Sequence, residues 1–205
     1  MQADTGVDAV AYYDDAAERF AQLYDSISFE AVHPTILGYL PRKGRALDIG
    51  AGSGRDARAL AERGLDVTAV EPAAGFVSRA APRDTRIRWV NDRLPELAGL
   101  KEEVGDYDFI LCSAVLMLLP PGDLAPSFKR MERLLARSGL VWANIRSRVA
   151  GEPGGIFHDH SDDVLLGAAM SAGLECIEWI ETDDALGRGP RRWRSFLFSR
   201  KMSSI

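Results

Sequence analysis

The segment 45–64, RALDIGAGSGRDARALAERG, constrains the fold more than any other part of this chain. A short apolar run leads into glycines at alternate positions, Gly50, Gly52 and Gly54, and a helical pattern follows. Glycine tolerates positive φ angles and lets a ligand lie against bare backbone. A helix that begins there points its first N–H groups at the same place. The segment therefore predicts a strand, a ligand-binding turn and a helix in succession.

Strand-like and helical segments alternate along most of the chain. After helices predicted at 7–25 and 28–39, the expected strands are 45–50, 66–72, 87–92, 107–119, 140–147, 175–182 and 191–200. The expected helices between them are 54–64, 73–81, 124–139 and 162–174, the third ending at a glycine. Such alternation predicts an α/β, Rossmann-like, doubly wound sheet of seven strands, mostly parallel. The last two strands have no helix between them, so we expect an antiparallel last strand in a pair at one edge.

Length and composition bound the remaining possibilities. A chain of 205 residues predicts a single domain, 1–205, with a helical N-terminal cap at 1–43 and the Rossmann-like core at 44–205. The net charge of −5 gives the whole chain no attraction to nucleic acid or anionic membranes. We expect neither a signal peptide nor a membrane span, since no apolar run approaches about 20 residues. The two cysteines are far apart in sequence, as is usual for thiols of a reducing compartment. Together with the expected lack of a signal peptide and a membrane span, this indicates a soluble, cytoplasmic chain.

Three ligand classes compete for the glycine turn. A triphosphate loop needs a lysine after its glycines, but Arg55 and Asp56 stand there. A dinucleotide fingerprint, G-x-G-x-x-G, would require glycine where Arg55 stands, and a bulky residue there would hold the helix off the pyrophosphate. Asp48, two residues before Gly50, would repel a pyrophosphate as well. It suits a ligand with an ammonium group, such as the amino-acid end of S-adenosylmethionine, or it braces the N–H groups of the loop.

Acidic residues also end the next two expected strands. Glu71 ends the second strand, where a carboxylate can accept hydrogen bonds from both ribose hydroxyls of an adenosine ligand. Asp92 ends the third strand and is placed to accept from an adenine amino group, with the backbone of Asn91 or Arg93 beside the ring. Ser113 follows the fourth strand, next to the first in the expected order, and should border the reactive methyl group.

These segments, ALDIGAGSG, VEP, VND and FILCSAVLML, resemble the class I S-adenosylmethionine-dependent methyltransferases of the small bacterial kind, over about residues 8–200. The resemblance implies that the N-terminal helices cover the cofactor and that Tyr12 or Tyr13 touches its carboxylate or the substrate. The product would be S-adenosylhomocysteine. The predicted cofactor-binding residues are Tyr13, Asp48, Gly50, Ala51, Gly52, Ser53, Gly54, Asp56, Glu71, Pro72, Asn91, Asp92, Arg93, Leu94, Ser113, Ala114 and Val115.

The segment 146–163 is the best candidate for contact with a methyl acceptor. It contains His158 and His160 among several aspartates, and its glycines predict a mobile lid. A metal site, a histidine facing the substrate and a surface loop are the alternatives. The SDD at 161–163 is typical of a helix N-cap and first turn. We predict no metal and favour His158 as the catalytic residue, because it adjoins the apolar GIF.

A basic segment, 186–195, keeps a second acceptor class open. Four arginines surround Trp193, and arginines with an aromatic side chain can grip phosphates and stack on bases. The alternative is a solvated hairpin tip balanced by the acids at 180–184. The main hypothesis is therefore a methyltransferase acting on a small molecule, with a transfer-RNA or other RNA methyltransferase as the alternative. A non-catalytic S-adenosylmethionine-binding protein is a third hypothesis, and the sequence indicates neither the acceptor nor the oligomeric state.

Overall fold

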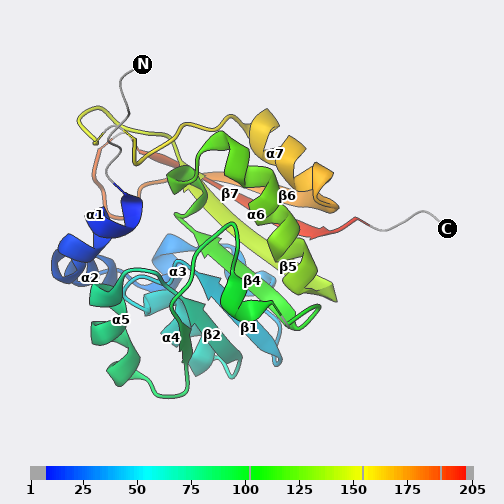
Figure 1. Ribbon diagram of the computed structural model, residues 1–205, viewed down its shortest axis with the longest axis horizontal. Helices are drawn as coiled ribbons and strands as arrows, with labels where there is room; N and C mark the ends of the chain where they lie inside the picture. The colour runs from blue at the N-terminus through cyan, green and yellow to red at the C-terminus, as the bar shows by residue number, and fades with distance from the viewer. Residues whose placement is uncertain (1–7, 102, 154, 190, 202–205) are drawn as a thin grey trace.

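The computed structural model describes residues 8–101, 103–153, 155–189 and 191–201, and its centre is one twisted sheet with helices on both faces (Figure 1). The strands of the described residues lie in the order β3-β2-β1-β4-β5-β7-β6. They are β1 (Arg45–Ile49), β2 (Asp66–Val70), β3 (Arg88–Val90), β4 (Tyr107–Ser113), β5 (Leu135–Arg146), β6 (Leu174–Asp183) and β7 (Arg192–Arg200). The expected seven-stranded α/β sheet is confirmed.

The first five strands run parallel, and β7 runs antiparallel to both β5 and β6. The predicted edge pair is thus present, with β7 inside and β6 at the edge. Strand order reverses between β1 and β4, because β2 and β3 lie on one side of β1 and the later strands lie on the other. In open parallel sheets, ligands bind beyond the carboxyl ends of the strands at this point.

The helices are α1 (Ala9–Asp15), α2 (Ala17–Asp25), α3 (Phe29–Val32), α4 (Arg55–Glu62), α5 (Ala74–Ala80), α6 (Pro121–Leu134) and α7 (Asp162–Ser171). Short 3₁₀ turns occupy Ile36–Gly38, Ala81–Arg83, Ala98–Leu100 and Leu116–Leu118. Figure 1 places α6 and α7 together beside the β5, β7 and β6 half of the sheet. No helix within these described stretches is long and apolar enough to cross a bilayer.

Three helix predictions need correction. The helix expected at 7–25 is two helices, because Ala16 leaves the helical region with φ −112° and ψ 16°; its expected first residue, Val7, lies outside the described residues. The segment 28–39 holds only α3 and a 3₁₀ turn. The helix expected at 124–139 begins at Pro121 and stops at Leu134. It therefore ends before Gly139, the glycine that the sequence predicts at its end.

That glycine, Gly139, belongs to β5 instead. A Cβ on it would lie 2.8 Å from the carbonyl oxygen of Tyr107 on the neighbouring strand, so the sheet needs glycine at this close approach. By contrast, Gly64 and Gly173 follow α4 and α7 with φ of +89° and +92°, the left-handed conformation of a helix C-terminus. Glycine therefore ends a helix at Gly64 and at Gly173, whereas at Gly139 it lets two strands pack closely.

Two apolar layers hold the sheet. On one face, α6 contributes Phe128 and Met131 to a buried cluster with Phe196 and Phe198 of β7. On the other face, Leu60 of α4 and Ile36 pack with Trp142 of β5. Because both faces are covered, the strands are fixed in register, and their carboxyl ends are held together at one edge of the sheet.

Candidate functional site

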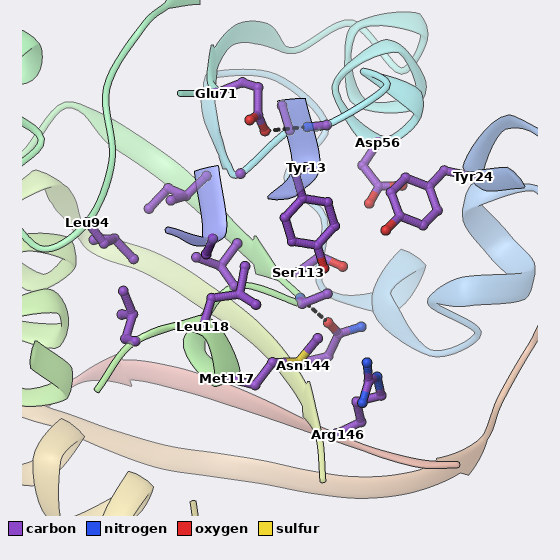
Figure 2. A pocket seen from close by; sticks show the side chains of 18 of the residues that line it. Tyr13, Tyr24, Asp56, Glu71, Leu94, Ser113, Met117, Leu118, Asn144 and Arg146 are labelled. Atoms are coloured by element: carbon purple, nitrogen blue, oxygen red, sulfur yellow. Dashed lines mark hydrogen bonds between the residues drawn. The ribbon is translucent and has the colours of Figure 1, made fainter. Parts of the chain in front are cut away.

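A cavity of about 630 Å³ opens at the carboxyl ends of β1, β2, β4 and β5, beneath α1. This volume is typical of small-molecule sites. Figure 2 shows side chains from the N-terminal helices, the glycine turn and the ends of β4 and β5 pointing into it. The predicted residues that line the cavity are Tyr13, Gly50, Ala51, Gly52, Ser53, Asp56, Glu71, Pro72, Asp92, Arg93, Leu94, Ser113, Ala114, Val115 and His158. Asp48, Gly54 and Asn91 lie outside this lining.

The three glycines of the turn differ in what they make room for. All three have positive φ, but a Cβ on Gly50 would lie 2.3 Å from Val115, and one on Gly54 would lie 3.1 Å from Trp89. A Cβ on Gly52 would meet no protein atom closer than 3.9 Å, and Gly52 lines the cavity. Gly50 and Gly54 therefore permit packing within the protein, whereas Gly52 leaves bare backbone for a ligand.

The two buried carboxyl groups beneath the turn, those of Asp48 and Asp56, have pKa values shifted in opposite directions. Asp48 at the end of β1 is 1% exposed, and its Oδ2 has no hydrogen-bond partner among the described residues. Burial, then the charge of Asp56, raises the pKa of Asp48 well above its usual range. Burial would also raise the pKa of Asp56, but His33 Nε2 at 3.2 Å and Arg55 Nε at 2.6 Å lower it. The negative charge therefore resides on Asp56, and Asp48 keeps one unpaired oxygen.

Glu71 at the end of β2 braces the turn. Its Oε2 accepts from the Gly52 N–H, a bond drawn in Figure 2, and its Oε1 accepts from the Ala73 N–H, each at 2.8 Å. Burial raises the pKa of Glu71. The bracing role considered for Asp48 thus belongs to Glu71. Each carboxylate oxygen has a second lone pair, so the predicted contact with ribose hydroxyls stays a prediction.

The residues after β3 form a self-bonded loop. Asp92 accepts from the Arg93 N–H at 2.8 Å and from the Gly99 N–H at 2.7 Å, so both of its oxygens hold backbone. Asn91 and Arg93 are exposed, and the Arg93 guanidinium lies 3.5 Å from Asp8. Leu94 is buried at the cavity wall. The adenine contact expected of Asp92 stays a prediction.

Two tyrosines cover the turn from above. Tyr13 of α1 and Tyr24 of α2 both line the cavity, and Figure 2 shows their rings among its side chains. Tyr24 also supplies the atom nearest to a Cβ on Gly52. Burial raises the pKa of both tyrosines, so they face the cavity as neutral hydroxyls. Tyr12, the alternative to Tyr13, packs against the apolar core instead. Tyr24 is a cavity residue that the sequence did not indicate.

The far wall of the cavity joins Asn144, which the sequence did not single out, to residues from the two segments expected to contact an acceptor, 146–163 and 186–195. Asn144 and Arg146 lie at the end of β5, while Arg188 and Trp193 come from the β6–β7 hairpin. Asn144 Oδ1 accepts from the Ala114 N–H at 2.8 Å and supports the left-handed backbone of Ala114, whose φ is +60°. The position of Asn144 and Arg146 at a parallel strand's carboxyl end was the available signal.

The two histidines of the 146–163 segment have different environments. His158 lines the cavity, and its backbone N–H donates to the Met117 carbonyl at 2.8 Å. His160 is buried, with its Nε2 3.0 Å from the Leu119 carbonyl oxygen, and burial lowers its pKa. Ser161 caps α7 with its hydroxyl 3.4 Å from the Val164 N–H, which confirms the predicted helix start. In the described part of the chain, no three His, Cys, Asp or Glu side chains gather as a metal site.

Comparison with known proteins finds similarity to methyltransferases. A methyltransferase-domain model matches residues 46–139. Putative methyltransferase YqeM of Bacillus subtilis is 27% identical over 157 residues, which cover 71% of this chain and 62% of YqeM. Uncharacterized methyltransferase Rv3342 of Mycobacterium tuberculosis is 36% identical over 104 residues, 48% of this chain and 39% of that one. Residues 46–139 thus match a methyltransferase domain, and the chain is similar to the class I S-adenosylmethionine-dependent methyltransferases.

Solved structures show how widely this methyltransferase fold is used. A 1,6-didemethyltoxoflavin-N1-methyltransferase of Burkholderia thailandensis, with S-adenosylhomocysteine bound, has a TM-score of 0.71 at 17% identity and covers 98% of this chain and 94% of its own. The cyclase SpnF has a TM-score of 0.75 at 14% identity and covers 97% of each chain. These likenesses establish the fold. Among the curated relatives, the chain spans 62% of the length of YqeM and 57% of a putative methyltransferase of Geobacillus.

S-adenosylmethionine is the cofactor of this methyltransferase family, and the residues present fit it. The unpaired Oδ2 of Asp48 lies under the turn, where a cationic amino-acid end would be stabilised by a carboxylate. Gly52 offers uncovered backbone to the same end of the ligand. Arg55, whose bulk argued against a dinucleotide, is turned toward Asp56 and the Tyr24 carbonyl.

Three of the four arginines in the basic segment 186–195 pair with carboxylates of the chain. Arg188 pairs with Asp184 at 2.7 Å, Arg192 pairs with Glu181, and Arg194 pairs with Asp162 at the start of α7. Each of these guanidiniums therefore already faces a carboxylate of the chain. Arg188 and Arg192 thus pair with acids of the segment 180–184, and the choice between a hairpin tip and an RNA-binding surface stays a prediction.

Proposed function

We propose that the protein transfers a methyl group from S-adenosylmethionine to a small-molecule acceptor and releases S-adenosylhomocysteine. One observation carries the proposal: a single cavity runs from Glu71 at the end of β2, past the turn at Gly52 and the end of β4, to Arg146 and the hairpin residue Trp193. Such a cavity has room for an adenosyl cofactor on one side of β4 and for an acceptor on the other. The similarity to methyltransferases supports a cofactor site on one side of β4. The polar far wall supports an acceptor site on the other side.

Methyl transfer needs alignment of the acceptor atom and exclusion of water more than it needs new chemical groups. When bound, S-adenosylmethionine supplies an electrophilic methyl group on a sulfonium. Tyr13 and α1 cover the cavity beside Ser113 and keep water from that point. His158 at the cavity wall is the candidate base for an acceptor that holds its proton at neutral pH.

The decisive measurement is calorimetric titration with S-adenosylhomocysteine, NADH and ATP. We expect only S-adenosylhomocysteine to bind tightly, and binding of NADH or ATP in its place would overturn the proposal. Gly52→Ala should weaken S-adenosylhomocysteine by at least about tenfold, because its methyl group enters the space that the ligand's amino-acid end would fill.

The matched control for that variant is Gly64→Ala. Gly64 also has positive φ, with no atom within 4 Å of a Cβ, but it follows α4 away from the cavity. Both variants carry a similar left-handed strain of about 1–2 kcal/mol. Equal affinity of the two variants for S-adenosylhomocysteine would show that the turn is not the binding site.

Cofactor binding alone does not prove transfer. The likeness to the cyclase SpnF shows that this fold also serves a protein with another name and chemistry. Formation of S-adenosylhomocysteine from S-adenosylmethionine with a metabolite extract, but not without it, distinguishes an enzyme from a binding protein. RNA binding at low salt would favour the RNA acceptor, and we expect none because the net charge of −5 gives the whole chain no attraction to nucleic acid. We place the protein in the reducing cytoplasm, since Cys112 and Cys176 are free thiols.

A further inference from the structure

The far wall of the cavity has a fixed hydrogen-bond polarity. The Ala114 N–H is a donor, so the side-chain atom of Asn144 that meets it at 2.8 Å must be the oxygen. The amide nitrogen of Asn144 is thereby forced to the other side, where it donates. Figure 2 shows this nitrogen on the same side as the guanidinium of Arg146, which points toward Tyr13 and Tyr24.

The acidic groups of this wall have their acceptor capacity used inside the protein. Asp184 accepts four bonds, three from the backbone N–H and guanidinium of Arg188 and one from Trp193 Nε1. Glu152 accepts two bonds from Arg146 and one from the Val149 N–H. These carboxylates orient the arginines, and a ligand therefore meets donors rather than acceptors along the wall. Asp183, which also lines the cavity, is exposed at its rim.

The wall belongs to the acceptor side of the cavity. The turn, Glu71 and Asp92 follow β1, β2 and β3, so the cofactor would run from β1 toward β3. Arg146 ends β5, two strands from β1 in the other direction, and the hairpin follows β6 beyond it. At about 4.8 Å per strand, the wall begins about 10 Å from the turn.

We propose that the methyl acceptor carries a carboxylate that docks between Arg146, Arg188 and the amide of Asn144. This inference rests on the proposed function and names the substrate class of the same site. Guanidiniums held by a protein carboxylate on one edge present their remaining N–H groups in the geometry that a carboxylate accepts. Trp193 and Tyr13 in the same cavity favour a planar, aromatic carrier for that carboxylate.

The test compares benzoate with benzamide, two probes of the same shape that differ in charge, on protein saturated with S-adenosylhomocysteine. Ligand-observed NMR should show benzoate binding at least about tenfold more tightly than benzamide. This comparison uses the wild-type protein and needs no variant. Benzamide binding as tightly as benzoate would overturn the proposal.

Variants then locate the effect. Arg188→Gln should weaken benzoate by about tenfold and leave benzamide unchanged, and Arg146→Gln serves as a second variant if the hairpin loses its structure. The matched control is Arg192→Gln, a hairpin arginine that is 74% exposed, pairs with Glu181 and does not line the cavity. Unchanged benzoate affinity in both folded cavity variants would contradict the proposal.

A final arm excludes the cofactor's own carboxylate as the group that these arginines hold. The Arg188→Gln protein should bind S-adenosylhomocysteine as the wild type does. Loss of that affinity with retention of 5′-methylthioadenosine, which lacks the amino-acid end, would overturn the proposal. If the wild type binds no S-adenosylhomocysteine, the proposed function has failed, and the benzoate comparison on the unliganded protein still reports separately on the wall.

Discussion

The buried carboxyl of Asp48 predicts opposite effects of one substitution on stability and on binding. Asp48→Asn keeps the size of the side chain and removes an ionisable group that is 1% exposed and has an unpaired oxygen. The folded pKa of Asp48 lies above its unfolded value, because burial and the charge of Asp56 disfavour the ionised form. The stability contributed by its bound proton is therefore complete below about pH 4 and lost as the pH rises through the folded pKa.

The Asp48→Asn variant has no ionisable group at this position, so its stability does not fall as the pH rises through the folded pKa of Asp48. Its stability relative to wild type should rise with pH by at most about 1.4 kcal/mol per unit above pH 4, until the folded pKa is passed. At pH 7 we expect the variant to be more stable by about 1–3 kcal/mol, part of the gain being offset by its own buried amide. Near pH 3, where both side chains are neutral, the gain vanishes and only the cost of the variant's buried amide remains.

The same substitution should weaken S-adenosylhomocysteine by about tenfold, because the ligand's ammonium group loses its buried counter-charge. Urea denaturation at pH 3, 5 and 7 measures the first effect, and calorimetry in two buffers of different ionisation enthalpy measures the second. Wild type should release protons on binding, since the ammonium lowers the pKa of Asp48, and the variant should release fewer.

The control for this pair of effects is Asp66→Asn, whose side chain is 73% exposed at the opposite end of the sheet. It should stay within about 0.5 kcal/mol of wild type at each pH. The reasoning is refuted if Asp48→Asn gains no stability between pH 3 and pH 7 and also keeps full affinity for S-adenosylhomocysteine.

Further outcomes concern the turn, the segment after β5 and the core. Glu71→Gln should cost about 1–3 kcal/mol of stability by urea denaturation and weaken S-adenosylhomocysteine, because one of two buried N–H groups loses its acceptor; no change would remove the bracing role. The ring of His160 should titrate below pH 6.5 by NMR, so the stability from its neutral form is full above that pH and falls as the pH drops through the folded pKa; titration at or above 6.5 contradicts this. Phe128→Ala should cost about 3–5 kcal/mol in denaturation, since its fully buried ring packs 5.4 Å from that of Phe198, and a loss below about 1 kcal/mol would contradict the packing.

The sequence by itself determined the sheet and the near side of the site. Alternating apolar strands and helices can bury their surfaces only as a layered α/β fold. The carboxyl ends of parallel strands meet at one edge of the sheet. Residues at strand ends, such as Glu71, Asp92 and Ser113, can therefore be predicted to lie close together from the sequence alone. The glycine turn was equally local, since positive φ angles depend on residue type more than on neighbours.

Tertiary structure decided what each of these groups faces. Glycine patterns could not show that Gly139 serves a strand or that, of the three turn glycines, only Gly52 leaves open space, because both depend on atoms of distant residues. The sequence placed Glu71 near the ligand, but its two backbone bonds appear only when the turn and α5 are folded.

The acceptor side depended on tertiary structure almost entirely. Asn144, Arg146 and Trp193 converge because β7 inserts between β5 and β6 and brings the hairpin back over the cavity. The polarity of this wall is set by two bonds that form only in the folded chain, one between strands from Ala114 to Asn144 and one across the hairpin from Trp193 to Asp184. The cofactor side is built from short segments that repeat a common geometry, whereas the acceptor side is built from contacts between segments far apart in the chain, so only the folded chain reveals it.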